Sequence, residues 1–173
     1  ALMELNDANL EKSPEESLGQ NKLEEEQRTI SGLNITGIAL GKKYVWVATN
    51  PNGLNRIDPN SRIVKSYVYD PNAENSISSN NLFDVIEDEK GMIWITSDAG
   101  INKFNPETEQ FTKYTEEDGL PTNLTESILE GDDGEMWIST QSGLSQMVTN
   151  ESLNKVTFIN YNADDGLGGD SFI

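Results

Sequence analysis

The sequence predicts an all-β protein made of repeated four-stranded antiparallel sheets, and three observations support this fold class. First, a tryptophan recurs at intervals of about 45 residues, at Trp46, Trp94 and Trp137. Second, a glycine follows each tryptophan at a nearly constant distance, at Gly53, Gly100 and Gly143. Third, the segments between them are short and alternate apolar with polar side chains. Four short strands in about 45 residues are typical of one blade, so we predict a partial β-propeller.

The unit around Trp94 shows how each strand is predicted. Its turns EDEKG, at 87–91, and NPETE, at 105–109, are polar and carry the glycine or proline that favours chain reversal. The short apolar runs between turns predict strands at 82–86, 92–96, 101–104 and 110–114. A sandwich of hairpins would share this alternation. The fixed recurrence of tryptophan and glycine instead favours equivalent, stacked sheets, with each tryptophan packed between neighbouring blades.

The same frame divides the chain into five units. Residues 1–30 read as the end of a preceding blade with a long acidic loop at 7–22, although the helix formers over 15–28 would also support a helix. The predicted complete blades span 31–76, 77–118 and 119–165, and 166–173 start the next blade. Natural propellers close with about four to eight blades. We therefore expect this chain alone not to form the ring of its parent protein.

Composition excludes several classes of function. The chain carries 30 acidic against 12 basic side chains, a formal net charge of −18, which repels phosphate backbones and anionic lipid. It has no cysteine and no histidine, so thiolate zinc sites, cysteine nucleophiles and Ser-His-Asp triads are absent. No apolar run approaches the roughly 18 residues of a membrane span. We predict no nucleic-acid partner, no direct membrane contact, no catalysis and no cofactor.

Two stretches carry a family resemblance: NSISSNNLFDVIEDEKGMIWITSDAGINKFNPETEQFTKY, from residue 75, and DGLPTNLTESILEGDDGEMWISTQSGL, from residue 118. They resemble the two-component-regulator propeller repeats of Bacteroides and related bacteria, over about residues 30–173. The resemblance implies the periplasmic sensor region of an inner-membrane hybrid receptor that detects a cue, often an oligosaccharide. In that family an immunoglobulin-like domain, a membrane helix and a histidine kinase follow the propeller. The first unit departs from the pattern at 41–43 and 50–52, and no ligand-site residue carries over.

Two enzymatic or metal-binding alternatives rest on acidic turns. The stretch 132–137, DDGEMW, is similar to the Asp-box of sialidase-like propellers, but that box is a turn motif. A sialidase-type site needs an arginine cluster, and this chain has only Arg28, Arg56 and Arg62. The turns at 87–89 and 130–133 offer carboxylates to Ca²⁺ but lack the spacing of a calcium loop. We interpret them as solvated hairpin tips, and predict no metal site. Propeller lyases use histidine, which is absent.

Meander geometry places candidate ligand contacts at one end of the blades. If strands A to D follow in order, the B–C turns and D–A connections share one end, here called the B–C/D–A end. The A–B and C–D turns share the opposite end, the A–B/C–D end, where the acidic turns are expected. The B–C/D–A end gathers polar side chains suited to sugar hydroxyls: Asn50, Asn52, Asn81, Asp98, Asn123, Gln141 and Ser142. Polar residues at loop tips are also common surface filler.

The predicted architecture also has consequences for partners. A blade is apolar on both faces, and a blade without a neighbour leaves one face bare. We therefore expect self-association through the open faces. A module for interaction or dimerisation, without any ligand, is the alternative to the ligand-sensing function.

Overall fold

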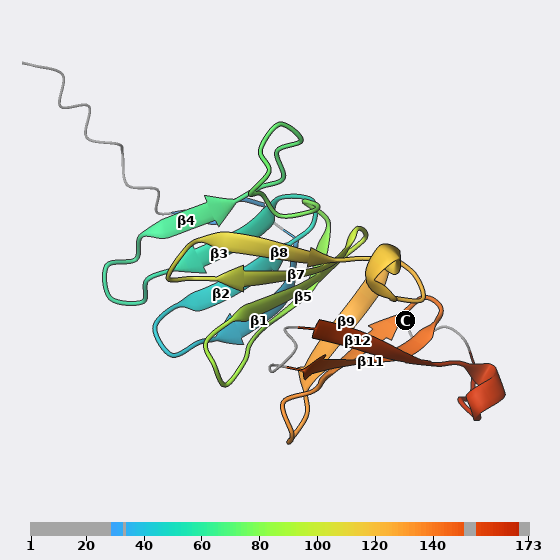
Figure 1. Ribbon diagram of the computed structural model, residues 1–173. Helices are drawn as coiled ribbons and strands as arrows, with labels where there is room; N and C mark the ends of the chain where they lie inside the picture. The colour runs from blue at the N-terminus through green and yellow to red at the C-terminus, as the bar shows by residue number, and fades with distance from the viewer. Residues whose placement is uncertain (1–28, 33, 151–154, 170–173) are drawn as a thin grey trace, which may run out of the picture.

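The computed structural model describes residues 29–32, 34–150 and 155–169, and these form three four-stranded antiparallel sheets (Figure 1). The predicted all-β class and the four-stranded blades are confirmed. The predicted partial units at 1–30 and 166–173 lie largely outside the described residues. The choice between loop and helix at 7–22 lies wholly outside them.

Each sheet is a simple meander in which neighbours in sequence are neighbours in space. The first sheet contains β1 (Ile35–Leu40), β2 (Val45–Thr49), β3 (Gly53–Ile57) and β4 (Val64–Tyr67). The second contains β5 (Leu82–Glu87), β6 (Ile93–Ser97), β7 (Gly100–Asn105) and β8 (Gln110–Tyr114). The third contains β9 (Thr125–Glu130), β10 (Met136–Thr140), β11 (Gly143–Asn150) and β12 (Lys155–Tyr161). Two 3-10 turns, η2 (Glu116–Asp118) and η4 (Ala163–Asp165), follow β8 and β12. The four strands predicted for the second unit are all present, with ends shifted by at most one residue.

The sheets pack face to face, and strand A of each sheet lies beside strand A of the next, β1 by β5 and β5 by β9. Two apolar clusters fill the spaces between them. One joins the first and second sheets around Trp46 and Phe104, whose rings meet edge to face with centroids 5.7 Å apart. The other joins the second and third sheets around Trp94, Ile138 and Met147. Each cluster is therefore shared by two blades.

The three tryptophans hold equivalent positions on strand B but differ in burial. Trp46 and Trp94 are buried, as predicted for side chains packed between blades. Trp137 is only partly buried, because it lies on the face of the third sheet that points away from the second. It stacks instead on Tyr161 of its own sheet, with ring centroids 5.9 Å apart. The predicted interblade position therefore holds for the first two tryptophans, and Trp137 belongs to an open face.

The acidic A–B turns are not simply solvated tips, and this expectation was wrong for Asp88. Asp88 is buried, its Oδ2 accepts a hydrogen bond from Trp94 Nε1 at 2.8 Å, and its Oδ1 accepts one from the Met92 amide at 2.8 Å. In the third sheet Glu135 Oε1 accepts from Trp137 Nε1 at 3.1 Å. A buried indole N–H needs an acceptor. In these two sheets an acid of the A–B turn supplies it.

Every B–C turn closes with the same contacts. The last residue of strand B donates its hydroxyl to the carbonyl of the turn glycine, at 2.7, 2.8 and 2.9 Å for Thr49, Ser97 and Thr140. The glycine itself lies at positive φ, +89° for Gly100. A Cβ there would lie 2.2 Å from the Tyr114 carbonyl oxygen. Only glycine fits, because both the dihedral and the close approach of strand D exclude a side chain.

A matched pair of substitutions separates these two requirements. Gly134 also has positive φ, +77°, but a Cβ there would meet nothing within 4 Å. We predict that Gly134→Ala lowers the free energy of unfolding by about 1 kcal/mol, the strain of the dihedral alone. Gly100→Ala adds a steric overlap with the backbone and should lower the free energy of unfolding by more than about 2 kcal/mol. Urea unfolding of both variants measures the difference, and equal losses would contradict the close-approach argument.

Candidate functional site

The B–C/D–A end is built from equivalent turns, and three predicted residues occupy the same position in them. Asn50, Asp98 and Gln141 each follow the last residue of strand B directly. Their backbone amides donate to the residue before strand A of the same sheet, at 3.0, 3.4 and 3.2 Å. The position directly after strand B thus places one side chain of each blade at this end, and the residue type differs between the three blades.

A second set of contacts links each B–C turn to the start of the following blade. The amide of Gly53 donates to Asn80 O at 3.0 Å, and that of Gly100 donates to Asn123 O at 2.7 Å. The Oδ1 of Asn80 accepts from the Tyr69 amide, and that of Asn123 from the Glu116 amide, at 2.8 and 2.9 Å. Asn80 and Asn123 are therefore equivalent. The side-chain oxygen of each stabilises the D–A connection that precedes it by accepting a backbone hydrogen bond.

The hydrogen bonds therefore match Asn123 to Asn80, and Asn81 to Leu124, although Asn81 and Asn123 both precede a leucine in the sequence. Asn81 is engaged differently, since its Nδ2 donates to Asp98 Oδ2 at 2.6 Å. The structure brings these two predicted residues together within one blade.

The first blade shows the least regular version of this end. Its B–C turn contains a cis peptide bond between Asn50 and Pro51. The exposed Asn52 accepts a hydrogen bond from Ser31 Oγ at its carbonyl oxygen, at 3.1 Å. This turn, at 50–52, where the first unit departs from the repeat pattern, is therefore tied to the chain segment that precedes strand A.

The predicted residues of the third blade line a hollow of about 350 Å³. Gln141 and Ser142, both exposed, form it together with Asn162, Ala163 and Asp164 of the D–A connection. Asn162 caps η4, because its Oδ1 accepts from the Asp164 amide at 2.8 Å. The sequence reasoning missed the three residues of the connection. Their signal is the likeness of NADDGL, at 162–167, to TEEDGL, at 115–120, which forms the same capped turn.

These capped turns also correct the expected charge of this end. The sequence predicts polar side chains at this end and the acidic turns at the opposite end. The structure places further acids on the D–A connections: Glu116, Glu117, Asp118, Asp164 and Asp165. Amides and hydroxyls thus lie among carboxylates, and the whole end carries an acidic rim. Such a surface suits a ligand rich in hydroxyl groups better than an anionic one.

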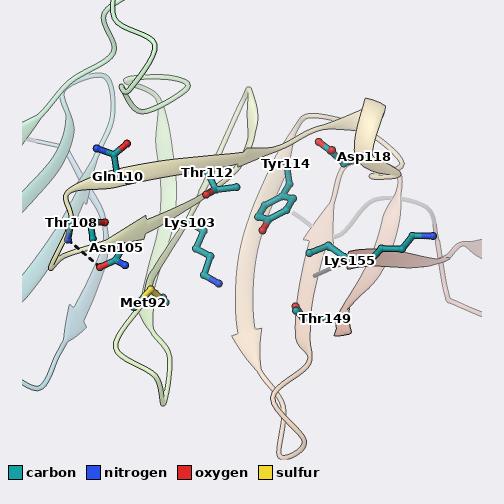
Figure 2. Close-up of a pocket in the computed structure, with 11 residues that line it drawn as sticks. Met92, Lys103, Asn105, Thr108, Gln110, Thr112, Tyr114, Asp118, Thr149 and Lys155 are labelled. Atoms are coloured by element: carbon teal, nitrogen blue, oxygen red, sulfur yellow. Dashed lines mark hydrogen bonds between the residues drawn. The ribbon is translucent and has the colours of Figure 1, made fainter. Parts of the chain in front are cut away.

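A groove of about 630 Å³ runs along the outer side of the second and third sheets (Figure 2). Figure 2 shows Lys103, Thr112 and Tyr114 from the second sheet facing Thr149 and Lys155 from the third. The Lys103 ammonium lies over the Trp94 ring, 5.0 Å from its centroid. The groove is mixed in polarity and contains none of the residues predicted for the ligand site.

The corresponding region between the first and second sheets is filled by an ionic cluster. Glu109 accepts from Lys65 Nζ at 2.6 Å, from the Tyr67 hydroxyl at 3.2 Å and from Arg56 Nη1 at 3.3 Å. The hydrogen bond from Lys65, followed by the nearby positive charges, holds the pKa of Glu109 below its usual value despite partial burial. Desolvation raises the pKa of the Tyr67 hydroxyl, so it stays a donor.

Two further findings bear on the class of site. Within the described ranges, no group of three or more histidine, cysteine, aspartate or glutamate side chains is placed to hold a metal ion. Over the same ranges, no helix is long and apolar enough to cross a bilayer.

The fold and its loop ends define a section of a β-propeller, and comparison with solved structures agrees. The chain is similar to the extracellular domain of the hybrid two-component system BT3049 from B. thetaiotaomicron, with 26% identity over 82% of this chain and a TM-score of 0.66. It is also similar to the extracellular domain of BT4673 from the same organism, with 19% identity over 73% and a TM-score of 0.58. This chain covers 20% and 17% of those two chains. The resemblance to sensor propellers predicted from the repeats is confirmed.

A third likeness shows the fold alone. Virginiamycin B lyase from Staphylococcus aureus matches 78% of this chain at 18% identity, with a TM-score of 0.55, and the match covers 42% of the lyase. No protein-family model and no curated protein sequence matches this chain.

The ionic cluster at Glu109 generates a pH-dependent prediction. Because the folded-state pKa is lowered, the stabilisation is present above the unfolded pKa, about 4.3, and is lost as pH falls through the folded value. We expect Glu109→Gln to lower the free energy of unfolding at pH 7 by less than about 1 kcal/mol, since the pair is partly exposed. The difference from the parent should shrink as pH falls below the unfolded pKa and vanish below the folded-state pKa. Urea unfolding at pH 7 and at a series of lower pH values tests this, with Glu74→Gln, at an exposed position, as control; a deficit that does not shrink as pH falls would contradict it.

Proposed function

We propose that this chain is part of the ligand-sensing β-propeller of a two-component receptor, in its periplasmic region. The likeness to the BT3049 extracellular domain carries this proposal, because it extends over 82% of the chain at 26% identity. Both sensor neighbours are extracellular domains. A membrane helix and a histidine kinase elsewhere in the parent protein belong to the same proposal.

An oligosaccharide is the ligand class that the B–C/D–A end fits best. The hollow beside Gln141 and Ser142 offers an amide and a hydroxyl, which both donate and accept hydrogen bonds, as sugar hydroxyls do. Asp98 and the acids of the connections add acceptors for hydroxyl protons. The net charge of −18 disfavours anionic ligands at this acidic end.

We propose that this section performs no catalysis. Its sequence contains neither histidine nor cysteine, which removes the common general bases and nucleophiles. The Staphylococcus aureus lyase that shares the fold is catalytically inactive when one of its histidines is replaced by alanine. Among the acids of the described residues, Asp88 has a structural partner in Trp94.

Sugar recognition can be tested by substitutions at the two ends of the blades. We expect binding of a panel of xylo-, cello-, arabino- and galacto-oligosaccharides, measured by isothermal titration calorimetry, to identify at least one ligand. Gln141→Ala and Asp98→Ala should each weaken its affinity about three- to tenfold, the loss of a hydrogen bond or two.

The control for this experiment is Asp132→Ala, an exposed acid in the A–B turn of the third blade. Its affinity should equal that of the parent chain. Loss of binding in Asp132→Ala with unchanged affinity in Gln141→Ala would place recognition at the opposite end.

Self-association is a second candidate function, favoured by the open face of the third sheet. This face consists of Leu129, Trp137, Val148 and Ile159, and Leu129 is 66% exposed. In the second sheet the equivalent tryptophan, Trp94, is 2% exposed because the third sheet covers it. Bare apolar surface contributes roughly 25 cal/mol per Å² when it is buried. A second copy of the chain would bury this face by symmetric pairing.

Light scattering after size exclusion at micromolar concentration tests this candidate. We expect a mass of about twice 19.2 kDa for the parent chain. Leu129→Glu should shift the mass to the monomer value by charging the open face, whereas Val68→Glu, on an exposed residue after β4, should leave the dimer intact. A monomeric parent chain would exclude the second candidate and leave the sensing proposal standing.

A further inference from the structure

Strands C and D of the first two sheets carry equivalent side chains on the face that meets the next sheet. A cation pairs with the tryptophan of strand B in each sheet, Arg56 in the first and Lys103 in the second. A tyrosine ends strand D in each sheet, Tyr67 in the first and Tyr114 in the second. Each tyrosine ring packs against the tryptophan of its own sheet. Arg56 therefore corresponds to Lys103, and Tyr67 to Tyr114.

One carboxylate joins these groups between the first and second sheets, and the third sheet does not supply its equivalent. Glu109, from the β7–β8 turn, accepts from the cation and from the tyrosine hydroxyl of the first sheet, at 3.3 and 3.2 Å. In the register of the sheets Phe158 corresponds to Phe111, so Val156 takes the place of Glu109. A valine side chain cannot accept the hydrogen bonds that a carboxylate accepts.

The groove of Figure 2 lies at this position between the second and third sheets. Lys103, Tyr114 and Val156 line it, and Figure 2 shows the Lys103 ammonium and the Tyr114 hydroxyl pointing into the space between the sheets. Among the described residues, neither group makes a hydrogen bond or an ion pair. Both are open to the groove, because within the described ranges Trp46 Nε1 is the one unpaired polar side-chain atom that lacks accessible surface.

The Lys103 ammonium lies over the Trp94 ring, and this contact leaves its N–H groups able to bind an anion. Cation–π attraction acts through the charge distribution of the ring and uses no hydrogen-bond acceptor. Arg56 demonstrates this in the first interface, since its guanidinium lies 4.6 Å from the Tyr44 ring centroid and also donates to Glu109.

The surroundings of Tyr114 keep its hydroxyl a hydrogen-bond donor. Burial, followed by the nearby negative charge of Asp118, raises the pKa of this hydroxyl above its usual value. The Asp118 carboxylate is itself held by the Thr115 amide, at 2.9 Å, within its capped turn. Lys155 lines the groove from the third sheet, so two lysines face one aspartate on the lining. They offset locally the net charge of −18, which opposes an anion elsewhere on this chain.

We propose that this groove binds the carboxylate of a small organic acid, which accepts hydrogen bonds from the Lys103 ammonium and the Tyr114 hydroxyl. The ligand supplies the carboxylate that Glu109 supplies in the neighbouring interface. Charge-assisted hydrogen bonds of this type are stronger than neutral ones. The volume of about 630 Å³ lies within the range of roughly 300–1,000 Å³ typical of small-molecule sites. None of the predicted oligosaccharide contacts lines this groove, so the two proposals are independent.

Succinate and its neutral analogue succinamide test the charge requirement. Each is titrated into the ¹⁵N-labelled chain at pH 7 and about 0.15 M ionic strength, where exposed charges are screened. The amide resonances of Thr112 and Tyr114 on β8 are followed by NMR. We expect them to shift and saturate with succinate and to stay in place with succinamide. An equal response to succinamide, or no shift on β8 at about 100 mM succinate, would overturn the proposal.

Substitutions test the charge and the hydroxyl separately. Lys103→Gln should weaken succinate binding about tenfold or more, and Tyr114→Phe about three- to tenfold. The matched control is Lys113→Gln, which lies on the other face of β8 because it alternates with Tyr114, and it should leave the affinity unchanged. Unchanged affinity in Lys103→Gln would refute the proposed recognition.

A third variant supplies the carboxylate from the protein itself. Val156→Glu places an acid where Glu109 stands in the neighbouring interface. It should shift the Tyr114 amide resonance without ligand and abolish the response to succinate, because its own carboxylate occupies the two donors. A succinate titration identical to that of the parent chain would contradict the assignment of the site.

Discussion

The close approach of strand D to the B–C turn is the contact on which the rest of the structure depends. At Gly53, Gly100 and Gly143 a Cβ would lie 2.2–2.4 Å from the carbonyl of the strand-D tyrosine. Since the turn has no side chain, the end of strand D reaches it, and the D–A connection starts there. The amides of Gly53 and Gly100 then bind the carbonyls that precede the next blade. The lack of a Cβ at this glycine thus lets strand D reach the turn and close the blade. The amide of the same glycine fixes where the next blade starts.

Periodic features of the fold could be predicted from the sequence, because the residues that form them recur at regular intervals along the chain. The recurrence of Trp46, Trp94 and Trp137 predicts the blades, and alternating side chains predict the strands to within a residue in the second sheet. Loop equivalences could not be predicted as well. The A–B turn of the first blade is a residue shorter, and Asn123 matches Asn80 only through hydrogen bonds that no sequence spacing reveals.

The positions of the candidate residues were predictable from the sequence, and the groups around them less so. Topology alone assigns Asn50, Asp98 and Gln141 to one end, and the structure gives them equivalent positions. The acids of η2 and η4 lie at the same end. The sequences TEEDG and NADDG can be recognised as capped turns only after the structure has shown one of the two turns. The burial of Asp88 could not be predicted from the sequence either, since an acid in a polar turn is ordinarily solvated.

The placement of the apolar clusters has a consequence for how the molecule opens. The second sheet is covered on both faces, by the first sheet through Phe104 and by the third through Trp94. The outer sheets each have one such neighbour among the described residues. In a stack where contacts are made only between neighbours, local stability follows the number of covered faces. Among the described residues, we therefore expect thermal fluctuations to loosen the outer sheets before the middle one.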